Sequence, residues 1–108
     1  MGVQIPVFKE RIAAFCLRNH IQSMSFFGSV LRDDFRPDSD VDVLVEFEPG
    51  QEPGLMEIAA MEMELSDILG HKANLVERQS VEKSENYIRR RHILQSLETV
   101  YSQAANTA

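Results

Sequence analysis

The alternation of apolar and polar residues is clearest in the middle of the chain, over residues 41–47. There apolar side chains occupy every second position, at Val41, Val43, Val45 and Phe47. Successive side chains of a β-strand point to opposite faces, so this run predicts a strand with one buried face. Two shorter apolar runs, at residues 23–27 and 73–77, predict two further strands.

Three other segments have apolar residues at the spacing of an amphipathic helix. They are residues 6–19, 55–69 and 81–97. In the second we expect a buried stripe made of Leu55, Ile58, Ala59, Leu65, Ile68 and Leu69. Gly70 and Ser80 stand where a helix C-cap and a helix N-cap are expected. Residues 99–101 fit either a short strand or a further helical turn.

Strands separated by helices predict an α/β or α+β fold, with a mixed sheet of three or four strands. The 108 residues suffice for a single domain, and we expect its ordered core at about residues 6–101. No apolar run of about 18 residues predicts a membrane span, and the first residues lack the features of a signal peptide. The one cysteine, Cys16, cannot form an internal disulfide. These features together predict a cytoplasmic protein.

The formal net charge of −6 narrows the range of partners. Proteins that grip a nucleic-acid backbone are usually basic, because neutralising phosphates supplies much of their affinity. We therefore expect no direct nucleic-acid binding, and an acidic surface suits a basic protein partner better. A local site can still bind ATP with Mg²⁺ whatever the net charge.

The candidate chemistry lies in residues 26–47, where ten residues separate Gly28-Ser29 from Asp40-Val41-Asp42. On an extended strand Asp40 and Asp42 point to the same face, with Cα atoms roughly 6–7 Å apart. Two carboxylates at this spacing can share one or two hard cations. Gly28 allows close backbone approach, and Ser29 can open a short helix whose N–H groups face an anion. A phosphate binder beside a Mg²⁺ binder is the layout that nucleotidyl transfer requires.

This stretch resembles the minimal nucleotidyltransferase (MNT) family of the DNA-polymerase-beta superfamily. The matching residues are Phe27-Gly28-Ser29, Arg32, Pro37-Asp38-Ser39, Asp40-Val41-Asp42 and the strand that follows. The resemblance covers roughly residues 8–101. It implies a polymerase-beta-like palm, with a mixed sheet and helices packed on one face.

The resemblance also implies roles for individual residues. Asp40 and Asp42 are expected to bind Mg²⁺, with two ions the expected number, and ATP is the expected substrate. The residues expected around the nucleotide are Gly28, Ser29, Arg32 and Ser39. Arg32 either contacts phosphate or braces the loop, and Ser39 suits a hydrogen bond at the junction of loop and strand.

Asn74 is the main departure from the family pattern. Members of the superfamily usually have a third carboxylate here, which completes the second metal site and helps to deprotonate the incoming hydroxyl. An asparagine offers one carbonyl oxygen to Mg²⁺ but carries no charge and cannot act as a base. The substitution, natural or an engineered Asp→Asn exchange, keeps nucleotide binding possible and predicts slow catalysis. A smaller departure is Asp33, where many members have glycine.

The resemblance implies the antitoxin of a HEPN–MNT toxin–antitoxin pair. Such an enzyme uses Mg²⁺ and ATP to adenylylate a hydroxyl, expected to be that of a tyrosine, on the HEPN ribonuclease with which it forms a hetero-oligomer. The alternative is a pseudoenzyme antitoxin that neutralises the toxin by binding alone, and Asn74 favours it. A third hypothesis, an aminoglycoside-type nucleotidyltransferase, is weaker because such enzymes usually carry an extra helical domain.

Two further groups of polar residues have less specific interpretations. The basic run Arg89–Arg91 is either a solvated helix face or a contact for ATP phosphates or a partner. The three histidines show no metal-ligand spacing and are interpreted as structural. They are His20, His71 and His92.

Overall fold

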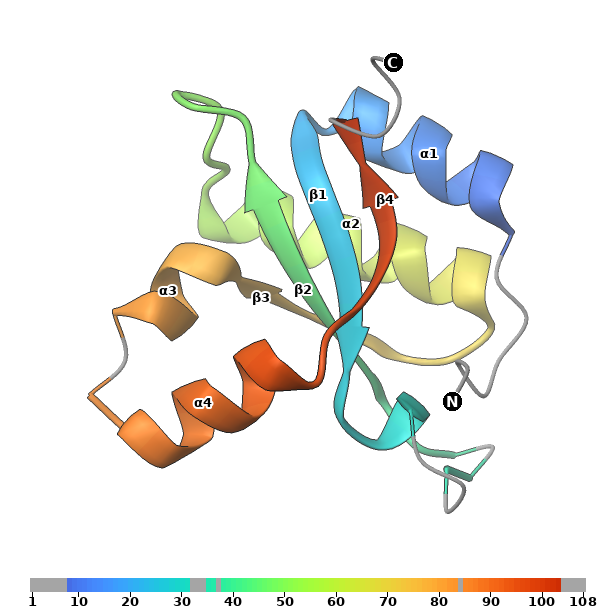
Figure 1. The fold of residues 1–108 in the computed structure, drawn as a ribbon. Helices are drawn as coiled ribbons and strands as arrows, with labels where there is room; N and C mark the ends of the chain where they lie inside the picture. Colours follow the sequence, from blue (N-terminus) through green and yellow to red (C-terminus); the bar gives the residue numbers. More distant parts are fainter. Residues whose placement is uncertain (1–7, 32–34, 37, 84, 104–108) are drawn as a thin grey trace.

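A four-stranded mixed sheet forms the centre of the computed structural model (Figure 1). The structure describes residues 8–31, 35–36, 38–83 and 85–103, with the backbone alone for Ser29, Tyr87 and Arg89. In chain order the elements are α1 (Lys9–Arg18), β1 (Ile21–Phe27), the 3₁₀ helix η1 (Gly28–Leu31), β2 (Val41–Phe47), α2 (Leu55–Leu69), β3 (Ala73–Glu77), α3 (Arg78–Glu82), α4 (Tyr87–Gln95) and β4 (Glu98–Ser102).

The strands lie side by side in the order β3-β2-β1-β4. β1 is antiparallel to both β2 and β4, whereas β2 and β3 are parallel. A parallel pair needs a crossover connection, and α2 supplies it. The three strands expected from the sequence are confirmed, and residues 98–102 form a strand at the sheet edge, which decides the open choice at residues 99–101.

One face of the sheet is covered by α1 and α2 (Figure 1). The predicted alternation along β2 holds, because Val43 and Val45 lie on this face and are fully or almost fully buried. They belong to one hydrophobic cluster with residues of both helices, including Phe15 and Leu65. Burial of these apolar side chains is the main contribution to the stability of the sheet.

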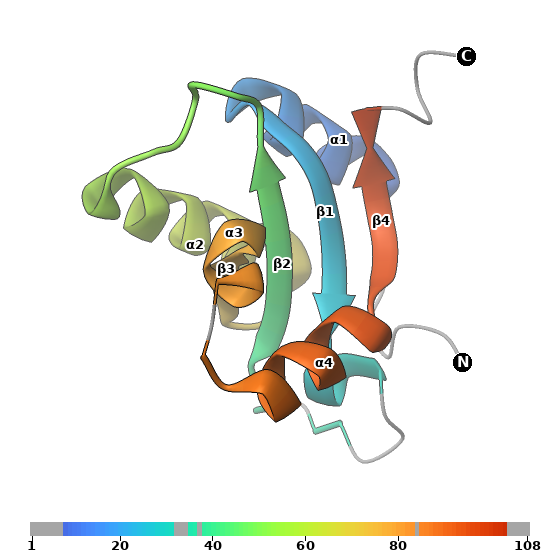
Figure 2. The same cartoon turned by 60° about the vertical axis from the view of Figure 1, so that its left-hand side comes forward.

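The opposite face of the sheet is also partly covered, by α3 and α4 (Figure 2). There Leu44 of β2 and Phe27 of β1 are buried in a second cluster, together with Val81 of α3 and Ile93 of α4. The expectation that helices pack on one face only is therefore wrong in this detail. Apolar residues on both faces of β1 and β2 give the sheet two surfaces to bury.

The C-terminal helix expected at residues 81–97 is two helices. α3 begins earlier, after Glu77, so Ser80 lies inside this helix and is not its cap. α4 starts at Tyr87. In one straight helix Val81 and Ile93 would lie about 18 Å apart along the axis, at 1.5 Å per residue. The break lets both side chains reach the same cluster on the sheet.

The first helix is shorter than expected, because Phe8 takes a non-helical conformation and α1 begins at Lys9. The expected residues 6 and 7 lie outside the described residues. Cys16 is fully buried in α1, and burial raises the pKa of its thiol to about 12. No helix in the described ranges is both long and apolar enough to cross a membrane.

α2 has the expected bounds, but its buried stripe differs from the expectation. The buried side chains are Met61, Leu65, Ile68 and Leu69. Leu55 is 87% exposed, and Ala59 is also exposed. Both had been assigned to the buried stripe. The register of the helix against the sheet depends on the crossover geometry, which hydrophobic spacing alone does not define.

The packing of β2 generates a stability prediction. Val45→Ala should lower the free energy of unfolding by ~1–3 kcal/mol, through lost burial and an unfilled cavity. Leu55→Ala is the control, since it removes an exposed side chain and should change stability by less than ~0.5 kcal/mol. Chemical denaturation followed by circular dichroism measures both. An equal loss for the two variants would contradict the assignment of the β2 core face.

Candidate active site

Asp40 and Asp42 lie at the beginning of β2, where the strand leaves the loop that follows η1. Asp40 is exposed, and Asp42 is partly buried on the strand face opposite to the valines. Asp42 is paired in register with Phe27 of β1 on one side and with Asn74 of β3 on the other. The sheet thus sets the position of Asp42 through two neighbouring strands.

Asn74 contacts both aspartates. Its Nδ2 atom donates to Asp40 Oδ2 at 3.3 Å and to Asp42 Oδ1 at 3.4 Å. A neutral amide donor between two carboxylates relieves part of their mutual repulsion. The structure therefore brings together the three residues that the sequence assigned to the catalytic centre, while their catalytic roles remain a prediction.

Gly28 faces the other side of the Asp42 carboxylate. A Cβ atom added at Gly28 would lie 2.7 Å from Asp42 Oδ2, closer than such atoms approach in proteins. The residue also has a backbone φ of +80°, which residues other than glycine rarely adopt. Gly28 is thus required both for the turn from β1 into η1 and for the placement of Asp42.

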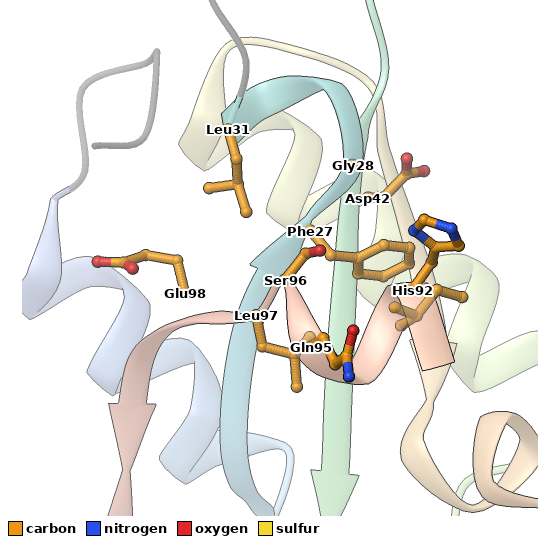
Figure 3. A pocket seen from close by; sticks show the side chains of 10 residues that line it. Phe27, Gly28, Leu31, Asp42, His92, Gln95, Ser96, Leu97 and Glu98 are labelled. Carbon is orange, nitrogen blue, oxygen red and sulfur yellow. The ribbon is translucent and has the colours of Figure 1, made fainter. Parts of the chain in front are cut away.

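A cavity of about 630 Å³ opens beside Asp42 and Gly28 (Figure 3). Its other walls come from η1, from the C-terminal half of α4 and from the start of β4, including Leu31, His92 and Glu98. In Figure 3 the Asp42 carboxylate and the His92 ring lie on the same side of the view. The volume of the cavity falls in the range of about 300–1,000 Å³ that is typical of small-molecule sites.

His92 is a lining residue that the sequence analysis interpreted as structural. No metal-ligand or catalytic spacing marks it, and only the folding of α4 against the sheet brings it to the cavity. Gln95 and Ser96 reach the same cavity from the same end of α4. The basic run at residues 89–92 was the one available signal that this helix could serve a site.

The other residues assigned to the site from the sequence do not line the cavity or lie outside the described residues. The Ser39 hydroxyl accepts from the Arg36 backbone N–H at 3.1 Å, so it closes a local turn. Arg32 lies outside the described residues, and only the backbone of Ser29 is described, within η1. In the basic run, Arg90 donates to the Glu82 backbone carbonyl at 3.2 Å and so ties α4 to α3.

The donor set at Asp40 and Asp42 fits Mg²⁺. This ion prefers oxygen ligands and is usually held by one or two carboxylates together with substrate phosphates. Two carboxylates within hydrogen-bond reach of one amide nitrogen are close enough together to act on one ion. The described residues contain no group of three or more His, Cys, Asp or Glu that could hold a metal. The remaining ligands of a Mg²⁺ ion here would come from water and from oxygen atoms of the substrate.

The family model described as "Nucleotidyltransferase domain" matches residues 9–96, from α1 to the junction between α4 and β4. The chain belongs to this family. The enzyme class expected from the sequence is thereby confirmed, and the matched range contains all residues assigned to the site.

Two curated relatives are named for protein adenylylation. Protein adenylyltransferase MntA of Thermococcus cleftensis is 36% identical over 61 residues, which is 56% of this chain and 60% of that protein. A candidate protein adenylyltransferase of Methanocaldococcus jannaschii, MJ0435, is 29% identical over 79 residues, which is 73% of this chain and 83% of that protein.

Solved structures confirm the fold and the resemblance to minimal nucleotidyltransferases. A candidate minimal nucleotidyltransferase superposes with a TM-score of 0.63 at 29% identity, over 83% of this chain and 86% of the other. A toxin–antitoxin structure with AMP-PNP gives 0.66 at 14%, over 93% and 77%. A tri-AMPylated Shewanella oneidensis HEPN toxin in complex with an MNT antitoxin gives 0.59 at 13%, over 92% and 73%.

The close approach of Gly28 to Asp42 generates a matched pair of variants. Gly28→Ala should lower stability by more than the ~1–2 kcal/mol that a positive φ costs an alanine, because its Cβ also collides with the carboxylate. Gly50→Ala is the control, since Gly50 has a φ of +79° and nothing within 4 Å of an added Cβ. Thermal unfolding of both variants isolates the collision. Equal losses would show that Asp42 can move away freely.

Proposed function

We propose that this protein is a Mg²⁺- and ATP-dependent protein adenylyltransferase that acts as the antitoxin of a HEPN-type ribonuclease. The observation that carries the proposal is the convergence of Asp40, Asp42 and Asn74 beside Gly28 and an open cavity, in a chain of the nucleotidyltransferase family. The names of its adenylyltransferase relatives support the reaction, and the AMP-PNP complex of a structural neighbour supports ATP as the nucleotide.

In this proposal each residue has a distinct role at the reacting phosphate. Asp40 and Asp42 would hold Mg²⁺, which when bound would neutralise charge on the triphosphate. Gly28 lets the backbone of η1 approach the phosphates, with Ser29 next to it. The acceptor oxygen forms a bond to the α-phosphorus, diphosphate leaves with the electron pair of the broken bond, and the hydroxyl proton passes to solvent. Asn74 positions the two carboxylates but cannot take that proton.

The proposed acceptor is a tyrosine hydroxyl on the partner protein. A structural neighbour is an MNT antitoxin in complex with a tri-AMPylated HEPN toxin, which supports a protein acceptor and a hetero-oligomer. The net charge of −6 argues against RNA as a partner and favours a basic protein. We place this reaction in the cytoplasm. We expect the gene next to that of this protein to encode a HEPN-type helical protein.

A second candidate function rests on Asn74 alone. The Asn74 amide donates to both aspartates at the position where the superfamily has a carboxylate. In this second candidate function the chain has lost catalysis but still binds its toxin. It would then be a pseudoenzyme antitoxin that blocks its toxin by occlusion. The two candidates differ in one measurable property, which is whether the partner gains mass in the presence of ATP.

The metal and nucleotide assignment is tested by removing one carboxylate. Asp42→Ala should weaken MgATP binding strongly, because triphosphate charge is left unneutralised, and isothermal titration calorimetry measures it. Asp42→Asn is the matched variant, since it keeps the shape of the side chain and should leave the melting temperature unchanged or raised, as it relieves carboxylate repulsion. Unchanged MgATP affinity in both variants would refute the assignment.

The role of position 74 is tested by restoring the carboxylate. Asn74→Asp should raise adenylylation of the partner by at least ~100-fold, because positioned proton transfer contributes roughly 10²–10⁴-fold. Without metal this variant should melt at a lower temperature, since three carboxylates would then converge, and Mg²⁺ should restore its stability. Intact mass of the partner and differential scanning fluorimetry provide the two readouts.

The outcomes of this experiment separate the two candidate functions. If the unsubstituted chain modifies its partner as fast as Asn74→Asp does, position 74 is not the third carboxylate position. If neither form adds AMP and both still block the ribonuclease, the pseudoenzyme is correct. The melting temperature reports the local geometry even when no AMP is transferred.

A further inference from the structure

The outward side of α2 carries an exposed apolar stripe. Met56, Ala60 and Met63 are four and three residues apart, so their side chains lie along one side of the helix. Met56 is 88% exposed and Met63 is 73% exposed. Ala59 and Leu55 are exposed as well and extend the stripe toward the beginning of the helix. We call these five residues the α2 stripe.

The α2 stripe adds nothing to the hydrophobic core, because its side chains remain in water. The opposite side of α2 already packs on the sheet through Met61 and Leu65. Scattered apolar residues are common on protein surfaces, but a row of them along one helix is typical of a contact surface. Methionine side chains are flexible and polarizable, which suits contact with another protein.

The charges that border the α2 stripe are acidic. The sequence of α2 contains Glu57, Glu62, Glu64 and Asp67 and no lysine or arginine. Arg18 of α1 forms a salt bridge with Glu64. Within the part of the chain that the structure describes, the other three acids form no salt bridge. A basic border on the occupant would therefore complement this surface.

We infer that the α2 stripe docks an apolar surface bordered by lysine and arginine on the HEPN-type partner. The inference rests on the proposed function, since a ribonuclease must carry basic residues to bind RNA. A second copy of the chain fits less well. A symmetric dimer through α2 would place Glu57 and Asp67 opposite the same acids of the other copy.

The position of the α2 stripe separates docking from chemistry. α2 covers one face of the sheet (Figure 1). This face contains Val43 and Val45, whereas Asp42 lies on the other face of β2. A partner on α2 would leave the cavity beside Asp42 open to ATP. For the proposed transfer, the partner docked on α2 would extend around the edge of the sheet, so that its acceptor tyrosine reaches the cavity beside Asp42.

The test is a double substitution within the α2 stripe. Met56→Asp with Met63→Glu places two charges on the stripe, and an acid in the first turn also favours the helix. By calorimetry, the affinity for the HEPN-type protein expressed from the neighbouring gene should fall at least ~100-fold, the effect of removing two well-packed anchors. Ile88→Asp on α4 is the control, because Ile88 is also exposed, at 70%, and should change affinity less than about threefold.

Three further measurements assign each outcome. MgATP affinity and melting temperature of the double variant should match those of the unsubstituted chain, and binding of the unsubstituted chain to the partner should weaken with salt. Unchanged partner affinity in the double variant would overturn the inference. Self-association of the unsubstituted chain that the double variant abolishes would also overturn it, in favour of a homodimer. If the unsubstituted chain binds MgATP but not the HEPN-type protein, the proposed partner fails instead.

Discussion

The alternation of side chains along β2 is the constraint on which both the core and the candidate active site depend. Val43 and Val45 face the cluster built with α1 and α2. Asp42 directly precedes Val43 in the strand and must therefore face the other way. A shift of the strand by one residue would bury the carboxylate in the apolar cluster under α1 and α2, which is strongly unfavourable. Core packing therefore sets the direction of the candidate metal ligand.

The surroundings of Asp42 show how a small sheet builds a site from three strands. β1 is followed directly by Gly28, whose missing side chain makes room for one carboxylate oxygen, and β3 presents Asn74 to the other. Asp42 lies between them because its strand is the neighbour of both. In this arrangement the residue at position 74 affects both aspartates. An amide there holds the two aspartates together, whereas a carboxylate would add a ligand and a base.

α2 has a different role on each of its sides. Its inner side supplies core residues. Its residue Glu62 also protects the sheet edge, because the Glu62 carboxylate accepts from the Leu75 backbone N–H at 2.8 Å. Such a contact satisfies a backbone donor on an edge strand that could otherwise pair with another chain. Its outer side remains apolar and unpaired. In our proposals this crossover helix combines folding with recognition of the partner, while the candidate nucleotide site lies on the other face of the sheet.

The amino-acid sequence by itself determined the first three strands, the bounds of α2 and the nucleotidyltransferase assignment. Local periodicity and a short motif with fixed spacing carry that information, because both act between near neighbours in the chain. The break between α3 and α4, the covered second face and the exposure of Leu55 were decided by tertiary structure. His92 shows the reason most clearly. It lies 50 positions from Asp42 in the sequence, and only the packing of Ile93 against Leu44 brings it to the same cavity.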